Sequence, residues 1–415
     1  MDAAFKRIAK GWTMTDKIKI SNLYKVFGKN PSSAMDHVRN GVSKQELLDN
    51  HRHVLGLRDI NIDIPERQIQ VIMGLSGSGK STLIRHINRL IEPTEGQVVV
   101  DGVDVLQMSA DDLSEFRRHK QSMVFQKFAL LPHRTVARNA AYGLTVQGIA
   151  EDEAKERAQR WIDRVGLGGF ENHFPAQLSG GMQQRVGLAR ALATDAEILL
   201  MDEAFSALDP LIRTDMQDIL LDLQEELHKT IVFITHDLDE ALKLGDKIAI
   251  LKDGRLSQVG NPEDILLNPA DDYVAAFVRD VNRARVLTVD VVMRPPSLRL
   301  TSENIDAALR EMQGKKADYG YVFEGGEFRG VVTEEELAAA AKSNEGQTLY
   351  DLADDTQTVS ADSVLEDALP TILESDTPVA VVDDDGQFKG VISKRQLIRV
   401  LTEHRDEEGE TPPKD

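Results

Sequence analysis

Hydrophobic and polar positions along residues 18 to about 280 form two kinds of segment. Short continuous apolar runs, such as "IQVIM" at 69–73 and "ILLM" at 198–201, are typical of buried strands. Longer stretches with helical spacing lie between such runs, as in "STLIRHINRLI" at 81–91. Strands that alternate with helices in this way are typical of βαβ units, so the pattern predicts an α/β domain built on a mostly parallel sheet.

The pattern changes from about residue 284 to residue 403, where the sequence repeats itself with an offset of 60 residues. Each copy (about 284–343 and 344–403) reads as helix, strand, glycine-containing hairpin, strand and helix, an α+β unit. Capping boxes are predicted where the last helix of each copy begins, at Thr333 with Glu336 and at Ser393 with Gln396. A unit of about 60 residues is marginally stable alone, so we expect the two copies to pack together.

Three further segments stand apart from these two folded parts. Residues 1–17 are expected to form a loose leader, and translation could start at Met1 or at Met14. Residues 28–55 interrupt two strand-like segments and predict a helical insertion, with Ser43 and Glu46 capping a short helix. The acidic tail at 404–415 is expected to be disordered.

Composition excludes several classes of protein. The 415 residues contain no cysteine, which excludes disulfides, thiolate metal sites and a cysteine nucleophile. Apolar runs fall far short of the ~18 residues that suggest a membrane span, and the N-terminus lacks a secretory signal. The formal net charge of −20 argues against nonspecific binding of nucleic acid and against broad attachment to anionic lipid.

The strongest chemical signal is "GLSGSGKST" at 74–82, which lies between a predicted strand and a predicted helix. This is the G-x-x-x-x-G-K-[ST] phosphate-binding loop in its required context. Glycines let successive backbone N–H groups turn toward phosphate oxygens, the lysine places a charge on the β- and γ-phosphates, and the serine hydroxyl ligates Mg²⁺. The predicted phosphate-binding residues are Gly74, Ser76, Gly77, Ser78, Gly79, Lys80, Ser81 and Thr82.

A second signal is the acidic pair that follows the apolar run at 198–201. Asp202 emerges at the carboxyl end of a predicted strand, where ligands bind in open α/β sheets. We expect Asp202 to hold Mg²⁺ and Glu203 to polarise the attacking water.

Together these motifs resemble those of the ABC ATPases over residues 18 to about 260. "LSGGMQQR" at 178–185 resembles the ABC signature, and the loop glutamine, D-loop aspartate and switch histidine would be Gln126, Asp209 and His236. Phe27 resembles the aromatic residue that stacks on adenine, with Tyr24 as a second candidate. The resemblance implies an antiparallel β subdomain and a helical subdomain at about 130–190.

In that family two ATPase domains form a head-to-tail dimer with ATP sandwiched between the phosphate loop of one and the signature of the other. The resemblance therefore implies a homodimer of this chain, ATP and Mg²⁺ as cofactors, and hydrolysis. The implied roles are catalytic for Glu203, His236, Lys80 and Gln126; metal-binding for Ser81, Gln126 and Asp202; and contact with the partner's nucleotide for Ser179, Gly180, Gly181 and Gln183.

A narrower resemblance is to the ATPase subunits of glycine betaine/proline betaine importers. It rests on Ala204 where many importer ATPases have proline, on the insertion at 28–55 and on the C-terminal repeat, which resembles a tandem pair of CBS modules. It implies a peripheral protein on the cytoplasmic face of the inner membrane, a permease subunit bound at 128–143, and indirect coupling to a substrate-binding protein. Choline, carnitine or proline as the solute remains an alternative.

The CBS pair is expected to regulate transport by ionic strength or by a ligand such as an adenine nucleotide. The candidate phosphate partners there are Lys394, Arg395 and Arg399. Two other classes of protein fit the sequence less well. An ABC ATPase acting on nucleic acid or the ribosome usually has coiled-coil insertions, zinc motifs or two cassettes, which this sequence lacks. A non-enzymatic nucleotide sensor would not need Glu203 and His236.

Overall fold

A computed structural model describes residues 16–126, 129–206, 208–343, 347–353 and 357–402. The chain divides into two compact units, Met1–Val278 and Arg279–Asp415, which are described separately. The first strand, β1 (Asp16–Phe27), begins two residues inside the expected leader. The rest of the leader and the acidic tail lie outside the described residues.

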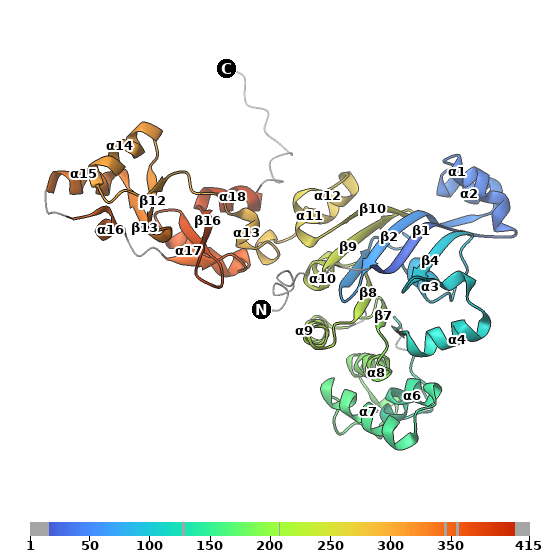
Figure 1. The fold of residues 1–415 in the computed structure, drawn as a ribbon. Coiled ribbons are helices and arrows are strands. Elements are labelled where there is room, and N and C mark those ends of the chain that lie inside the picture. Colours follow the sequence, from blue (N-terminus) through green and yellow to red (C-terminus); the bar gives the residue numbers. More distant parts are fainter. Residues whose placement is uncertain (1–15, 127–128, 207, 344–346, 354–356, 403–415) are drawn as a thin grey trace. The chain divides into compact units, whose positions relative to one another are not determined.

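The first unit is organised around a six-stranded sheet, and its strands β3 and β7 are buried at every position. Five neighbouring strands run parallel, and β10 pairs antiparallel with β9 at one edge (Figure 1). A parallel sheet of this kind is covered on both faces, which explains its continuous apolar runs. In spatial order the strands are β10 (Arg255–Gly260), β9 (Lys247–Lys252), β3 (Ile69–Met73), β8 (Thr230–Thr235), β7 (Ile198–Asp202) and β6 (Gln121–Val124).

A second sheet of four antiparallel strands shares its core with the first. Ile18 and Leu57 of this sheet belong to the same buried cluster as Ile72 of β3 and Leu83 of helix α3 (Lys80–Ile87). The helix that follows the phosphate loop is thereby held in the core of the unit. In spatial order the strands are β2 (Val54–Pro65), β1, β4 (Glu95–Val100) and β5 (Val103–Asp104).

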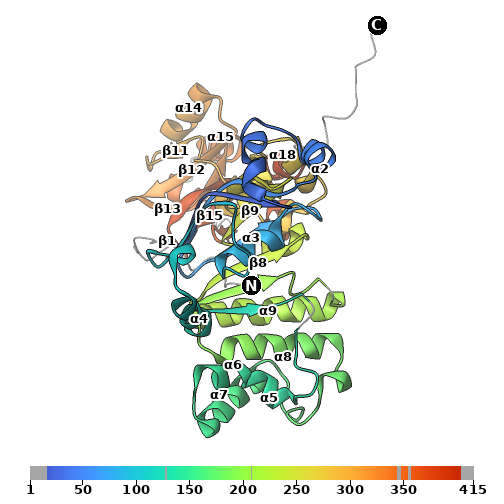
Figure 2. The ribbon, with the colours of Figure 1, turned by 90° about the vertical axis from the view of Figure 1, so that its right-hand side faces the viewer.

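Helices complete the unit in two places. The insertion at 28–55 forms α1 (Met35–Arg39) and α2 (Lys44–His51), whose buried Val38 and Leu47 pack against Val26 and Leu55 of the antiparallel sheet. Ser43 caps α2 by accepting a hydrogen bond from the backbone N–H of Glu46, as predicted. Figure 2 shows α5 to α8 as a separate helical layer. The other helices of the unit are α4 (Ala110–His119), α5 (Val136–Ala140), α6 (Tyr142–Gln147), α7 (Glu151–Arg164), α8 (Gly180–Ala193), α9 (Pro210–Leu227), α10 (Leu238–Leu244), α11 (Pro262–Leu267) and α12 (Asp272–Val278).

The second unit contains the repeat as two three-stranded sheets of identical topology. In each sheet a short first strand runs parallel to the central strand, and the third strand pairs antiparallel with the central strand. The short strands were not predicted because they are only two and three residues long. The first copy comprises α13 (Val289–Val292), β11 (Arg299–Leu300), α14 (Ile305–Lys315), β12 (Tyr319–Glu324), β13 (Glu327–Thr333) and α15 (Glu334–Ser343). The second comprises α16 (Leu349–Leu352), β14 (Thr358–Ser360), α17 (Leu365–Glu374), β15 (Val379–Val382), β16 (Phe388–Ile392) and α18 (Lys394–Thr402).

The two copies depend on each other for their cores. The leading helix of each copy packs against the sheet of the other: α13 contacts β16 and α18, and α16 contacts β12. The predicted capping boxes are present at the starts of α15 and α18. Equivalent residues Phe328 and Phe388 stack on each other with ring centroids 4.8 Å apart. These contacts explain why a single copy of about 60 residues would be marginal.

Candidate functional site

The phosphate loop connects β3 to α3 and requires glycine at several positions. Gly74, Gly77 and Gly79 have φ angles of 147°, 77° and 108°, a conformation that glycine adopts without strain. A Cβ atom on Gly74 would lie 2.2 Å from the carbonyl oxygen of Leu251. Within the same segment Ser76 is exposed, Ser78 is buried, and Thr82 lies half-buried in the first turn of α3. The backbone is therefore curled tightly against β9.

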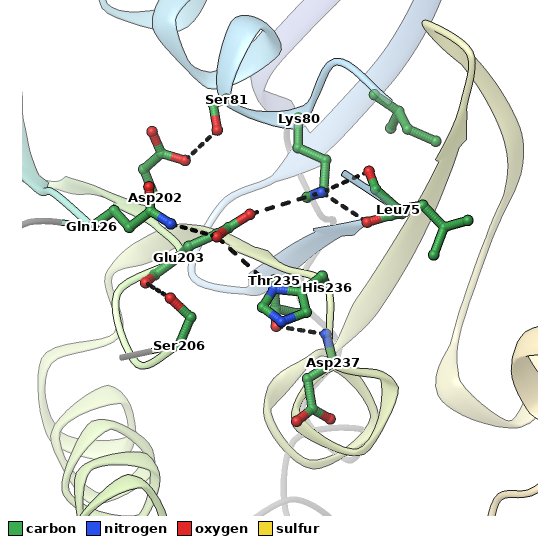
Figure 3. A network of polar contacts seen from close by, with 12 residues as sticks. Leu75, Lys80, Ser81, Gln126, Asp202, Glu203, Ser206, Thr235, His236 and Asp237 are labelled. Carbon is green, nitrogen blue, oxygen red and sulfur yellow. Dashed lines mark hydrogen bonds and ion pairs between the residues drawn. The ribbon is translucent and has the colours of Figure 1, made fainter. Parts of the chain in front are cut away.

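Lys80 lies at the first position of α3 with only 4 % of its surface exposed. Its ammonium group donates hydrogen bonds to the carbonyl oxygens of Gly74 (2.7 Å) and Leu75 (3.1 Å), and it lies 3.9 Å from Glu203 Oε1 (Figure 3). Burial lowers the pKa of Lys80, and the carboxylates of Glu203 and Asp202 offset part of that effect. A buried ammonium group held by neutral carbonyls and one distant carboxylate is well placed to attract an anion.

Asp202 ends β7 and is bonded to the helix that follows the phosphate loop. The Ser81 hydroxyl donates to Asp202 Oδ1 at 2.7 Å, and Arg85 Nη2 donates to Oδ2 at 3.3 Å. Hydroxyl and carboxylate oxygens are ligands that Mg²⁺ prefers, and Gln126 adds an amide oxygen nearby. No cluster of three or more His, Asp or Glu side chains suited to a metal occurs within the described ranges. These few oxygens fit a Mg²⁺ ion that takes its other ligands from phosphates and water.

Glu203 occupies the centre of the polar network and has a strained backbone, with φ at 47°. Its carboxylate accepts a hydrogen bond from Gln126 Nε2 at 2.7 Å and lies 3.9 Å from His236 Nδ1 (Figure 3). Three hydrogen bonds hold the strained backbone: Glu203 N–H donates to the Ile234 carbonyl, and the N–H and the hydroxyl of Ser206 both donate to the Glu203 carbonyl. The carboxylate therefore points toward both Lys80 and the ends of the neighbouring strands.

The signature residues lie elsewhere on the same unit. Ser179 caps α8 by accepting a hydrogen bond from Met182 N–H, and both it and Gly180 are exposed. Gly181 is required because a Cβ atom there would lie 2.6 Å from Ile212 Cγ2, and Gln183 Nε2 donates to the Leu178 carbonyl. No contact in the described part of the chain joins these residues to Lys80 or Glu203. The free end of α8 consequently presents its N–H groups to solvent.

The remaining predicted residues are placed as follows. Asp209 precedes α9 and is exposed, without a side-chain bond to the helix N-terminus. Phe27 ends β1 with 38 % of its surface exposed, and the ammonium group of Lys25 lies 4.9 Å from its ring centroid. Tyr24, the other aromatic candidate, packs against the insertion cluster. Phe27 is therefore the more exposed of the two rings, although it lies outside the polar network.

A groove of about 620 Å³ runs between α4, β6, α6 and α8. Leu90, Met123, Phe125 and Tyr142 contribute apolar surface, while Arg117, Arg118 and Arg190 contribute guanidinium groups. The segment at 128–143 borders it through Ala129, Leu131 and Tyr142; Phe128 lies outside the described residues. In the second unit, Lys394, Arg395 and Arg399 are exposed on α18.

Three residues of the site were missed by sequence reasoning. Arg85 bonds Asp202, Lys44 of α2 donates a hydrogen bond to the Gly77 carbonyl, and the hydroxyl of Tyr273 accepts one from Leu75 N–H. Arg85 lies one helical turn beyond Ser81, a spacing that could have suggested it. The other two come from distant segments, and no local signal points to them.

Comparison with known proteins identifies the relatives of this chain. Residues 57–206 match the ABC transporter family, and residues 350–403 match the CBS domain family. The glycine betaine/proline betaine transport system ATP-binding protein ProV of Salmonella typhimurium is 47% identical over 94% of this chain and 98% of its own length. The glycine betaine transport ATP-binding protein OpuAA of Bacillus subtilis is 46% identical over 93% and 92%.

A solved structure supports the same assignment. A dimeric ATP-binding cassette in a post-hydrolysis state bound to ADP and phosphate is 34% identical, covers 59% of this chain and 98% of its own, and superposes with a TM-score of 0.51. The predicted fold class is confirmed by these matches and by the sheets described above. The chain thus belongs to the ABC transporter ATPases, within the group of transport ATP-binding subunits that includes ProV and OpuAA.

Proposed function

We propose that this chain hydrolyses ATP between two copies of itself and thereby energises uptake of glycine betaine or proline betaine through a membrane permease. As an ABC ATPase the chain binds and hydrolyses ATP. The proposal concerns the formation of the ATP site by two copies of the chain and the identity of the transported solute. One observation carries the proposal. Lys80, Asp202, Glu203 and His236 converge at one end of the parallel sheet, whereas the signature at Ser179 is exposed and separate from them.

Each residue of the network has a role that its surroundings support. Lys80 and the backbone N–H groups of the loop would bind the β- and γ-phosphates. Mg²⁺, when bound, compensates charge on the phosphates, and Ser81, Asp202 and Gln126 would hold it. Glu203 would accept the proton of the attacking water, and His236 would orient the γ-phosphate and that water. Phe27 would stack on the adenine ring.

The second copy would supply what the network lacks. The exposed N-terminus of α8, with Ser179, Gly180, Gly181 and Gln183, carries partial positive charge and free N–H groups suited to a terminal phosphate. Asp209, exposed at the start of α9, would face the partner. Hydrolysis removes the phosphate that joins the two halves, so the dimer reopens.

The groove beside α6 and α8 supports a permease contact. Its mixed lining of apolar side chains and arginines suits a short helix with acidic or polar ends. Within the described residues no helix is long and apolar enough to cross a membrane. We place the chain on the cytoplasmic face of the inner membrane, bound through this groove, with a substrate-binding protein acting on the permease from the other side.

The ATPase does not touch the solute, so the solute is tested by transport. Cells that express this chain with its cognate permease and binding protein should take up labelled glycine betaine. Uptake should stop when the chain carries Lys80→Ala. Choline, carnitine and proline, the alternative solutes, are used as unlabelled competitors. At equal concentration, unlabelled glycine betaine should lower the uptake of the label more than any of these solutes does. If choline, carnitine or proline abolishes uptake of the label and unlabelled glycine betaine does not, the proposed solute is rejected.

The CBS modules are proposed to inhibit transport at low ionic strength through charge contacts that salt screens. The exposed cations Lys394 and Arg395 on α18 support this proposal; a bound adenine nucleotide is the alternative regulator. Reconstituted transporter carrying Lys394→Gln and Arg395→Gln should remain active at low salt. If the double variant still switches off in low salt as the wild type does, these cations are not the sensor.

A further inference from the structure

The insertion at 28–55 places a second lysine on the phosphate loop. Lys44 is the first residue of α2, and its ammonium group donates a hydrogen bond to the carbonyl oxygen of Gly77 at 2.9 Å. Gly77 is an exposed residue in the middle of the loop. Lys80 bonds the carbonyls of Gly74 and Leu75 in the same loop. Two ammonium groups from distant parts of the chain are thus bonded to a single six-residue loop.

Several contacts hold Lys44 in this position. The Ser43 side chain caps the helix that carries it. The guanidinium group of Arg58, only 8 % exposed, donates to the Val42 carbonyl, and Arg58 N–H donates to the Gly254 carbonyl at 2.7 Å. The turn before Lys44 is therefore tied to β2, whose packing against the loop is close. The hydrogen bond from Arg58 therefore fixes the turn that places Lys44 next to the loop.

The two ends of the insertion are in contact with each other. The ring of His53 packs so closely on Gly28, the residue after Phe27, that a Cβ atom there would lie 2.5 Å from His53 Cδ2. His53 Nε2 also bonds the Lys29 carbonyl at 2.9 Å. The two ends of the insertion are therefore held against each other directly after Phe27, while α2 contacts the phosphate loop.

The charge of Lys44 is not neutralised by the protein. In the part of the chain that the structure describes, its one polar partner is the Gly77 carbonyl, and no carboxylate lies within ion-pair distance. An ammonium group has three donors, so two remain for a ligand. A phosphate oxygen is a much stronger acceptor than a carbonyl because the bond is charge-assisted.

We propose that Lys44 is a second phosphate-binding lysine, which raises the affinity of the site for a nucleoside triphosphate. This role of Lys44 depends on the proposed function only because it requires that the loop binds ATP. The hydrogen-bond partner of Lys44 is the Gly77 carbonyl, and in the described residues no contact joins Lys44 to Glu203 or His236. Lys44 therefore acts on binding and takes no part in proton transfer. Its loss should change KM and leave kcat nearly unaltered.

The test compares two lysines of the insertion in the full-length protein. Lys44→Met removes the proposed contact, and Lys29→Met removes the same charge from an exposed side chain of the same segment. We expect Lys44→Met to weaken binding of a fluorescent ATP analogue about fivefold to tenfold, with kcat within about twofold. Lys29→Met should change binding less than about twofold, and Lys44→Arg should restore most of the affinity.

Nucleotides with fewer phosphates separate a charge contact from a structural one. The loss caused by Lys44→Met should decrease from ATP to ADP to AMP, and it should shrink as salt is raised. Equal losses for all three nucleotides, or a loss no larger than that of Lys29→Met, would overturn the role of Lys44 while leaving the ATPase assignment intact. Wild-type protein that bound no ATP would overturn both.

Discussion

Replacing Glu203 by glutamine tests the centre of the proposed mechanism with little disturbance of the fold. Glutamine has the same shape and keeps a carbonyl oxygen that can accept the hydrogen bond from Gln126 Nε2, now 2.7 Å from the carboxylate. The three hydrogen bonds that hold the strained backbone of Glu203 do not involve its side chain. We therefore expect the stability of the variant to lie within about 1 kcal/mol of wild type.

The magnitude of the effect on hydrolysis follows from the loss of a proton acceptor. A well-placed general base contributes about 10²- to 10⁴-fold to a rate, so kcat should fall by at least about a hundredfold. The affinity for ATP, in contrast, should rise. At the 3.9 Å between Lys80 Nζ and Glu203 Oε1, the Coulomb attraction is about 4 kcal/mol at an effective dielectric constant near 20. Without this carboxylate, the buried ammonium group is left to the triphosphate, and ATP should bind more tightly.

The assay measures phosphate release and, separately, ATP-dependent dimerisation by analytical ultracentrifugation. Glu335→Gln, which removes an exposed carboxylate from α15 in the second unit, is the matched control. We expect the Glu203→Gln protein to form stable dimers with ATP and to release almost no phosphate, and the control to behave as wild type. Hydrolysis within about tenfold of the wild-type rate, or failure to dimerise in ATP, would refute the reasoning.

Three further substitutions test other parts of the structure. Burial lowers the pKa of His86 to about 4, below its ordinary 6.5, so protonation favours the unfolded chain. The free energy of unfolding of the wild type should therefore fall by about 2–3 kcal/mol between pH 6.5 and pH 4. Urea midpoints measured at both pH values should show a smaller fall for His86→Leu. Tyr273→Phe removes the acceptor of Leu75 N–H and should cost about 1 kcal/mol and raise KM for ATP about threefold; an unchanged KM contradicts the link. Phe388→Ala breaks the stack with Phe328 and should destabilise the second unit by about 2–3 kcal/mol in calorimetry, with ATP hydrolysis by the isolated protein unchanged.

Features encoded within a short stretch of sequence were predictable. The capping boxes at Thr333 and Ser393 are local contacts between residues three apart, and the structure contains both. The phosphate loop between β3 and α3 is equally local, because its glycines, lysine and serine follow one another in the chain. The repeat was visible because both copies bury the same side chains.

Features that depend on tertiary contact were not predictable. The bond from Lys44 to Gly77 joins residues 33 positions apart, and the bond from Leu75 to Tyr273 joins residues 198 apart. The exchange of leading helices between the two repeat copies is another example, because nothing in "VDVV" or "LYDL" indicates which sheet each helix will cover. Such contacts depend on how whole helices and strands pack, and a local sequence pattern does not report that packing.

The charge of the chain illustrates the same division between local and global properties. A formal net charge of −20 predicts repulsion of polyanions, yet the site proposed here takes a ligand with several negative charges. The two properties are compatible because salt screens exposed charges beyond about 8 Å at physiological ionic strength. Within that range the phosphate loop is contacted by Lys80 and Lys44, and Arg85 shields the Asp202 carboxylate. A compact anion that fits the loop therefore meets cations and N–H groups, whereas an extended polyanion such as a nucleic acid also meets the net negative charge of the chain.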